Sequence, residues 1–203
     1  INMSSSVRII HKEAFKNCKK LKEINLPQSL EIIEDGAFAG CKNLSEINIP
    51  KELVFIGESA FSECSNLKEI SLPNTIKEIK EHAFYECTNL SSVYLGSNIE
   101  KIGDYAFYEC KNLKELDISS SIKEIGTECF TETEWVKNIP ADLNGLKCYH
   151  NILLKSIDLK EDIIISSDIT VIAGNAFEDS KKIKSIILPE GLKNIEAYTL
   201  SNC

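Results

Sequence analysis

Apolar and polar residues alternate over short stretches of this chain, and the arrangement returns every 23 residues. In one unit Ile24 and Leu26 are apolar while Glu23 and Asn25 are polar, which is the period-2 pattern of a strand with one buried face. Pro27 follows, and because proline has no N–H for a strand ladder, it ends the predicted strand. The Ala-Phe-x-x-Cys segment before each strand is too short for a free-standing helix, so we expect one helical or 3-10 turn there.

Several columns keep this spacing together, and a shared spacing of that kind indicates an internal repeat. The phenylalanine column occupies residues 15, 38, 61, 84, 107 and 130. Columns of alanine, cysteine, leucine and isoleucine run in the same register, and most units carry proline after the strand. One unit cannot bury its apolar side alone, whereas stacked units can, with their strands pairing in parallel along one wall. Equivalent residues of successive coils should then lie roughly 4.8 Å apart.

The 23-residue spacing is interrupted after Phe130. The next phenylalanine in the pattern is Phe177, 47 residues further on. We predict a single domain over residues 1–203. It has regular repeats over 1–130, an irregular segment over 131–158 with a small hairpin in it, and resumed repeats over 159–203. The chain begins at Ile1 and stops at Cys203 partway through a repeat, so we expect it to be a fragment of a longer protein.

The repeating phrase A-F-x-x-C-x-x-L-x-x-I-x-L-P resembles the BspA-like leucine-rich repeat family, found on bacterial surfaces and in some protist parasites. The resemblance covers most of the chain outside the irregular segment. It implies an α/β leucine-rich repeat fold: a right-handed, horseshoe-shaped solenoid with parallel strands on its concave face and short helical or 3-10 turns elsewhere. It also implies an extracellular or cell-surface role in adhesion and protein binding. The chain departs from the phrase at Gly96, Ser119, Thr133, Ser180 and Thr199-Leu200.

Charge and hydropathy narrow the class of partner. The formal net charge is −8, which gives the chain no electrostatic reason to bind nucleic acid or an anionic membrane. No apolar run approaches the length of a membrane-spanning helix, and no signal peptide is visible. We therefore expect a protein partner, such as a host or matrix protein, no membrane insertion within this segment, and a monomer.

Five of the eight cysteines share one column of the repeat, at residues 18, 41, 64, 87 and 110. Parallel side chains in a stack point the same way, so we expect free thiols that act as small apolar core groups rather than a ladder of disulfides. Cys129 should also be in the core. Cys148 is the cysteine for which exposure or pairing is most expected, and pairing of Cys203 stays open.

Motifs of the common enzyme families are absent, and no cysteine or histidine spacing suits a metal. We expect no catalytic residue, cofactor or metal ion. His11 and His82 are interpreted as solvated side chains. His150 lies close to Cys148 in the sequence, but no third catalytic group can be proposed for that pair.

The outward positions of the strands form the candidate binding surface, an acidic and amide-rich strip. Lysines precede several of these positions, so the strip could also be a solvated face whose charges are balanced. Solenoids often dock partners on their strand face, and an exposed aromatic residue commonly anchors such contacts. The predicted partner-binding residues are Glu23, Asn25, Glu46, Asn48, Glu69, Ser71, Tyr94, Glu115 and Asp117.

The sequence thus predicts a non-catalytic adhesion or protein-binding module of a surface or secreted protein. The first alternative is a passive spacer within a larger surface protein. The second is a hydrolase or transferase built on the segment 131–158, which would need a pocket formed by Trp135, Cys148 and His150.

Overall fold

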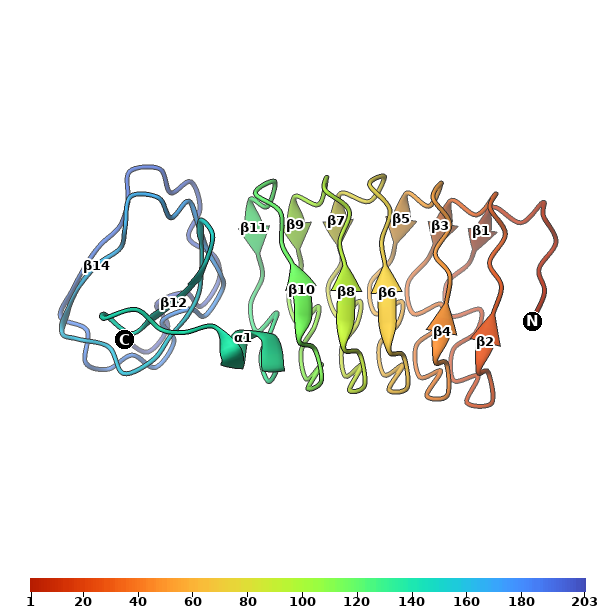
Figure 1. Ribbon diagram of the computed structural model, residues 1–203, viewed down its shortest axis with the longest axis horizontal. Helices are drawn as coiled ribbons and strands as arrows, with labels where there is room; N and C mark the ends of the chain where they lie inside the picture. The colour runs from red at the N-terminus through yellow and green to blue at the C-terminus, as the bar shows by residue number, and fades with distance from the viewer.

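The computed structural model describes all residues from Ile1 to Cys203 as a stack of coils in which short strands pair in parallel (Figure 1). One row of strands forms the wall that the alternating pattern predicts, and we call it the strand wall. Its strands are β2 (Glu23–Ile24), β4 (Glu46–Ile47), β6 (Glu69–Ser71), β8 (Ser92–Tyr94), β10 (Glu115–Asp117), β14 (Asp162–Ile164) and β16 (Ser185–Ile187). The pairing of β6 with β8 aligns Ile70 with Val93, so equivalent residues stack from coil to coil.

A second row of strands runs along another side of the coils, and the sequence pattern did not predict it. Each of these strands ends on the last apolar residue of its repeat, as at Ile33 and Ile56. The row consists of β1 (Ile9–Ile10), β3 (Ile32–Ile33), β5 (Phe55–Ile56), β7 (Glu78–Ile79), β9 (Lys101–Ile102), β11 (Glu124–Ile125) and β15 (Val171–Ile172).

The Ala-Phe segments form hydrogen-bonded turns rather than helices, as where the Cys41 N–H donates to the Phe38 carbonyl at 3.1 Å. The expected helical character of these segments is therefore not confirmed. Figure 1 shows the coils of residues 1–130 side by side in a nearly straight row, so the horseshoe curvature is not confirmed either.

Phenylalanine rings fill the interior of these coils in one continuous column. From Phe15 to Phe130 each ring stacks on the next, with centroids between 5.1 and 5.7 Å apart and planes within 6° of parallel. Phe38, Phe61, Phe84 and Phe107 are fully buried, together with the alanine before each of them. The predicted core column is thus confirmed.

Asparagine side chains add a second, exposed column. The Asn66 amide donates to Asn43 Oδ1 at 3.2 Å, Asn89 donates to Asn66 at 3.1 Å, and Asn112 donates to Asn89 at 3.2 Å. Each of these hydrogen bonds spans 23 residues and therefore ties one coil to its neighbour.

The irregular segment contains a short helix and a hairpin. Thr133 caps helix α1 (Glu134–Asn138), where its side chain accepts from the Val136 N–H. Strands β12 (Leu146–Tyr149) and β13 (Ile152–Ser156) then pair antiparallel, which confirms the predicted hairpin.

Strand β13 stands between two apolar clusters, and its first three residues are buried. Ile152 and Leu154 belong to the large cluster of the N-terminal coils, whereas Leu153 belongs to a smaller cluster around Phe177. In Figure 1 the N-terminal coils are seen from the side and the C-terminal coils nearly end-on. The stack therefore changes direction at α1 and the hairpin.

Candidate functional site

The strand wall carries the candidate binding residues on its outward positions. Glu23 aligns with Glu46 across β2 and β4, and Glu69 aligns with Ser92 across β6 and β8. Because strands alternate, the intervening Ile24 and Ile70 are buried beneath this surface while the carboxylates are exposed.

A groove of about 680 Å³ runs along this wall from β2 to β8. Buried isoleucines form part of its floor, and Tyr94 borders it with 53% of its surface exposed. Seven of the nine predicted residues line the groove: Glu23, Asn25, Glu46, Asn48, Glu69, Ser71 and Tyr94. The structure brings these residues together into one depression rather than scattering them over a flat face.

The groove carboxylates are not balanced by the neighbouring lysines. The side chains of Glu23, Glu46 and Glu69 form no ion pair and accept no hydrogen bond, although Lys68 also lines the groove. Elsewhere on the molecule, pairs such as Lys123 with Glu100 at 2.7 Å hold opposite charges together between coils. The groove therefore presents a row of carboxylates without ion-pair partners.

The two remaining predicted residues lie outside the groove and already have partners. Glu115 accepts from the Ser92 hydroxyl at 2.9 Å and from the Tyr94 hydroxyl at 3.4 Å. Asp117 accepts from the Tyr149 hydroxyl at 2.9 Å, and burial together with that carboxylate raises the pKa of Tyr149. Tyr149 comes from the hairpin, so no pattern in the repeats could have identified it as a neighbour of the strip.

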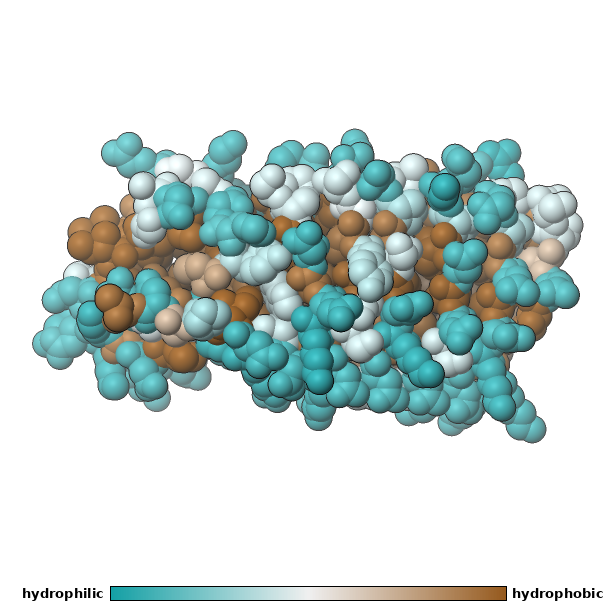
Figure 2. Space-filling model, viewed as in Figure 1, coloured by the Kyte–Doolittle hydropathy of each residue, from teal (hydrophilic) through white to brown (hydrophobic).

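Figure 2 shows this side of the molecule in the orientation of Figure 1. Polar side chains gather along its lower edge, and apolar surface is visible between polar groups over the strands and over the C-terminal coils. Ile164 and Ile187, at the ends of β14 and β16, are 66% and 58% exposed and contribute apolar surface to the C-terminal part of the strand wall.

All eight cysteines are free, and the thiol column has a more specific role than filling space. Each of the four buried thiols of the column, Cys41, Cys64, Cys87 and Cys110, donates to the phenylalanine carbonyl of the preceding coil, as Cys87 does to Phe61 at 3.1 Å. Burial raises the pKa of Cys41 to about 11 and raises the pKa of Cys87 well above its ordinary value. These thiols stay protonated and serve as hydrogen-bond donors.

Three cysteines lie outside the sealed part of the column. Cys18 is exposed, contrary to the expectation that all five column members are in the core, because it lies in the outermost coil. Cys203 is exposed as well, although its thiol donates to the Phe177 carbonyl at 3.1 Å. Cys148 is half-buried, and burial raises its pKa to about 11. Cys129 is buried as predicted.

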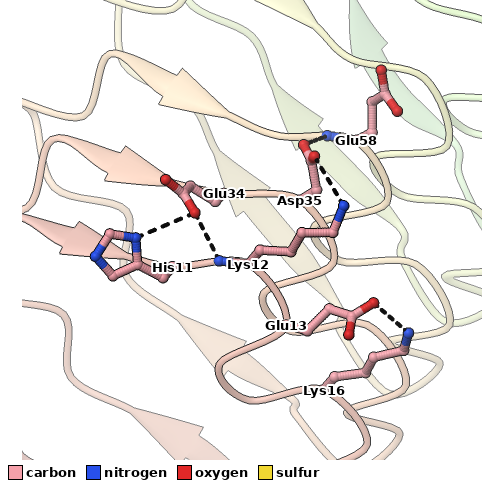
Figure 3. Close-up of polar contacts among 7 residues, drawn as sticks. All are labelled: His11, Lys12, Glu13, Lys16, Glu34, Asp35 and Glu58. Carbon is pink, nitrogen blue, oxygen red and sulfur yellow. Dashed lines mark hydrogen bonds and ion pairs between the residues drawn. The ribbon is translucent and has the colours of Figure 1, made fainter.

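The polar groups at one corner of the first coils fasten coils together (Figure 3). Glu34 accepts from the Lys12 N–H at 2.8 Å and lies 3.3 Å from His11 Nδ1. Asp35 accepts from the Glu58 N–H at 3.0 Å. His11 is largely exposed, as expected, but it has a carboxylate partner.

His82 belongs to a group of aromatic rings rather than standing free in solvent, which corrects our interpretation. Its ring stacks on Tyr105 at 5.0 Å and tilts against Tyr85 at 5.3 Å. A hydrogen bond to Glu86, followed by burial, raises the pKa of Tyr85 to about 12.

The residues considered for an enzyme do not form a shared pocket. Trp135 is buried and packs edge-on against Phe130 at 5.0 Å, while His150 lies against Tyr149 at 4.4 Å. The cavity lined by their sequence neighbours Thr133, Val136 and Lys147 is bordered by none of Trp135, Cys148 and His150. No group of three or more histidine, cysteine, aspartate or glutamate side chains is placed to hold a metal ion. None of the helices has the length and apolar character needed to cross a membrane.

With the fold and the groove described, the repeat can be compared with known families. Six copies of the BspA-type leucine-rich repeat region match, over residues 1–114, 33–144 and 147–203. The chain belongs to this family. The matched ranges leave out only residues 145 and 146, so they include nearly all of the segment 131–158, which our reading of the sequence had placed outside the resemblance.

Solved structures of bacterial leucine-rich repeat proteins share the fold. A leucine-rich repeat protein from Bacteroides ovatus is 22% identical with a TM-score of 0.60, over 100% of this chain and 64% of the other. A leucine-rich cell surface protein from Faecalibacterium prausnitzii is 20% identical with a TM-score of 0.60, again over 100% and 64%. The leucine-rich repeat protein of T. pallidum is 25% identical with a TM-score of 0.57, over 97% and 71%.

This BspA-type chain thus spans just under two thirds of the length of the first of these proteins. No curated protein matches it. The repeat fold is one that bacterial surface proteins use, which suggests an interaction or structural role, and leucine-rich repeat solenoids are typically non-catalytic.

Proposed function

We propose that residues 1–203 form one domain, a non-catalytic protein-binding module of a bacterial cell-surface or secreted protein. We propose further that it holds its partner in the groove of the strand wall. The observation that carries this proposal is the row of unpaired carboxylates at Glu23, Glu46 and Glu69 beside the exposed ring of Tyr94.

The groove has the composition of a recognition surface. Carboxylates about 4.8 Å apart repel one another, and a basic partner segment would relieve that repulsion on binding. Tyr94 supplies apolar area and a hydroxyl at the groove edge, which is how aromatic anchors act in many interfaces. The partner that fits is therefore a protein with a basic surface segment, for which a host or matrix protein remains our expectation. We expect the module itself to be monomeric.

A triple variant tests the groove: Glu46→Gln, Glu69→Gln and Tyr94→Ala together. The unmodified chain is immobilised and probed with a panel of purified extracellular-matrix proteins and with an oligolysine peptide, at low and at physiological salt. We expect the variant to bind at least about tenfold more weakly than the parent, because one hot-spot residue and two charges are lost. Circular dichroism should show an unchanged fold.

The matched control replaces exposed residues of the same types outside the groove: Glu52→Gln, Glu58→Gln and Tyr198→Ala. It removes the same charges and the same ring, and we expect its binding to equal that of the parent. Equal binding by the groove variant and the control would show that the groove is not the binding surface. A chain that binds none of the probes in either form would instead favour the spacer function.

A further inference from the structure

The corner formed by each Ala-Phe turn carries a regular backbone ladder. The N–H of the phenylalanine and the N–H two residues later both donate to carbonyls of the next coil. In one coil Phe107 donates to Cys129 at 2.9 Å and Glu109 donates to Thr131 at 2.9 Å. The two acceptors are themselves two residues apart, so the spacing of donors and acceptors matches.

This ladder stops at the last regular coil. The N–H groups of Phe130 and Glu132 have no acceptor in the structure. Just before them, the Glu128 N–H donates to the side-chain oxygen of Asn175 at 2.9 Å, so a side chain replaces the missing backbone there. Backbone donors in folded proteins are nearly always paired, and two adjacent ladder positions without partners therefore stand out.

The later segment that would have supplied these acceptor carbonyls does not pair with Phe130 and Glu132. At the equivalent corner, the Ser156 N–H donates to the Ala176 carbonyl at 2.9 Å, so this segment joins the C-terminal coil. It leaves a space of about 190 Å³ next to Phe130 and Glu132, which we call the corner cleft. Because a cavity of about 150 Å³ can admit benzene, the corner cleft has room for a short piece of main chain.

The charges around the corner cleft leave one cation without a partner. Lys137 pairs with Glu132 at 2.7 Å, and Lys147 donates to the carbonyls of Val136 and Lys137 at 3.0 and 2.9 Å. Lys155 lines the cleft, is exposed and forms no ion pair. Lys155 lines the same cleft as Phe130 and Glu132, so its charge faces the space beside the free donors. The pKa of Glu132 is lowered chiefly by its hydrogen bond from Lys137, and more weakly by the charges of Lys111 and Lys155.

The carboxylate of Glu128 also borders the cleft, but the Asn175 amide donates to it. An incoming acidic group would therefore meet two free N–H donors and one free ammonium group.

We propose that the corner cleft binds an acidic peptide segment of a partner protein. Two main-chain carbonyls of the peptide, two residues apart, accept from the N–H groups of Phe130 and Glu132, and an acidic side chain pairs with Lys155. The peptide main chain thereby continues the ladder at an unpaired backbone edge, as the turn of the next coil does for Phe107 and Glu109. A carboxylate alone cannot continue the ladder, because it carries no pair of main-chain carbonyls two residues apart. The site is independent of the groove, whose negative charge calls for a basic partner.

Hydrogen exchange of the full chain tests the free donors. We expect the amides of Phe130 and Glu132 to exchange at least about tenfold faster than those of Phe107 and Glu109, the same positions one coil earlier. Equal protection at the two coils would mean that the ladder is complete at Phe130 and would overturn the proposal.

Binding is tested on the ¹⁵N-labelled chain with the peptide Ac-Gly-Asp-Gly-Glu-Gly-NH₂. We expect saturable shifts of the Phe130 and Glu132 amides at millimolar peptide, and about threefold weaker binding in Lys155→Ala, the effect of one partly exposed ion pair. Lys51→Ala removes an exposed, unpaired lysine in a regular coil and should leave the affinity unchanged.

Two further probes decide the chemistry of the ligand. The peptide Ac-Gly-Lys-Gly-Lys-Gly-NH₂ should leave the two amides unshifted, and succinate should fail to produce saturable shifts. Absence of shifts with the acidic peptide, or equal shifts with succinate, would overturn the assignment of a peptide site. Because the groove variants of the preceding section leave the corner cleft untouched, failure of one proposal is distinguishable from failure of the other.

Discussion

The coils before Phe130 and the chain after it carry the same repeating sequence pattern, but side chains at equivalent positions pack differently in the two regions. Up to Phe130 every ring stacks face to face on its neighbour. The next ring is that of Trp135, which meets Phe130 edge-on with planes 61° apart, and Phe177 packs in a separate cluster. The aromatic column is therefore interrupted.

Another corner of the coils carries Gly126 and Gly174, and we call it the glycine corner. The hydrogen bonds at this corner continue past Phe130. Gly126 donates its N–H to the Ile102 carbonyl at 2.8 Å, and Gly174 donates to Ile125 at 3.0 Å, although 48 residues separate the two glycines. The backbone hydrogen bonds between coils therefore continue at the glycine corner, whereas α1 and the hairpin interrupt them at the Ala-Phe corner. A solenoid can therefore bend where one column of stacked residues ends, provided that another column keeps its register.

The largest effect should come from the aromatic column. Phe84→Ala removes a ring that lies between two others, and we expect a loss of about 3–5 kcal/mol in the free energy of unfolding. Phe177→Ala removes a ring that is equally buried but stacks on no other ring, so its loss should fall at the lower end of that range. Urea unfolding measures both, and a larger loss at Phe177 would contradict the distinction between the two regions.

Substitutions at the glycine corner should lower the free energy of unfolding nearly as much, both before and after the break at Phe130. A methyl group at Gly174 would lie 2.7 Å from the Thr127 backbone, and one at Gly126 would lie 2.5 Å from the Asp104 nitrogen. We expect Gly174→Ala and Gly126→Ala each to cost about 1–3 kcal/mol, as overpacking does. At Gly191 the nearest atom is 3.7 Å away, so Gly191→Ala is the control that should leave the melting temperature unchanged.

The asparagine column is confined to the regular coils, since Lys182 stands in its place after Phe177. Asn66→Ala removes two ladder hydrogen bonds and should cost about 1 kcal/mol, whereas Asn112→Ala removes one and should cost about half as much. Chemical denaturation of the two variants provides the measurement. Equal losses at the two positions would show that the ladder contributes nothing beyond turn preference.

Thiol labelling compares the two regions without changing their stability. Alkylation requires the thiolate, so native protein at pH 8 should react at the exposed Cys18 and Cys203. Cys148, with a pKa of about 11 against an ordinary value near 9.0, should react about a hundredfold more slowly, because its thiolate forms only as pH rises toward 11. Cys87 should be labelled only after unfolding. Rapid native labelling of Cys87, followed by mass spectrometry, would show that the column opens.

The sequence was sufficient to predict the stack because each core column repeats a residue type at a fixed spacing. Burial of Phe61, Cys64 and Leu67 could be predicted from that spacing alone. The second row of strands could not, because two-residue strands such as Ile32–Ile33 form only when a neighbouring coil supplies their partners. Local patterns do not contain that contact.

The groove was predictable as a set of outward residues but not in its extent. Strand alternation identified Glu46 and Glu69 as outward, while the hydrogen bond from Tyr149 to Asp117 depends on where an irregular hairpin folds back. The free N–H groups at Phe130 and Glu132 could not be predicted either, because the sequence does not show which later segment pairs with a given coil. The start of α1 was accessible in principle, since Thr133 precedes Glu134 as a capping residue does.

The hydrogen bonds between regular coils also bear on how such a chain grows by gene duplication. The Asn66 amide reaches back 23 residues and the Cys87 thiol reaches back 26, and the same offsets recur from coil to coil. Copying a segment of 23 residues therefore reproduces every one of these contacts, and the new coil arrives with its partners in place. Copying a segment whose length is not a multiple of 23 shifts the offsets. The array can thus lengthen or shorten by whole coils while each remaining regular coil keeps these contacts.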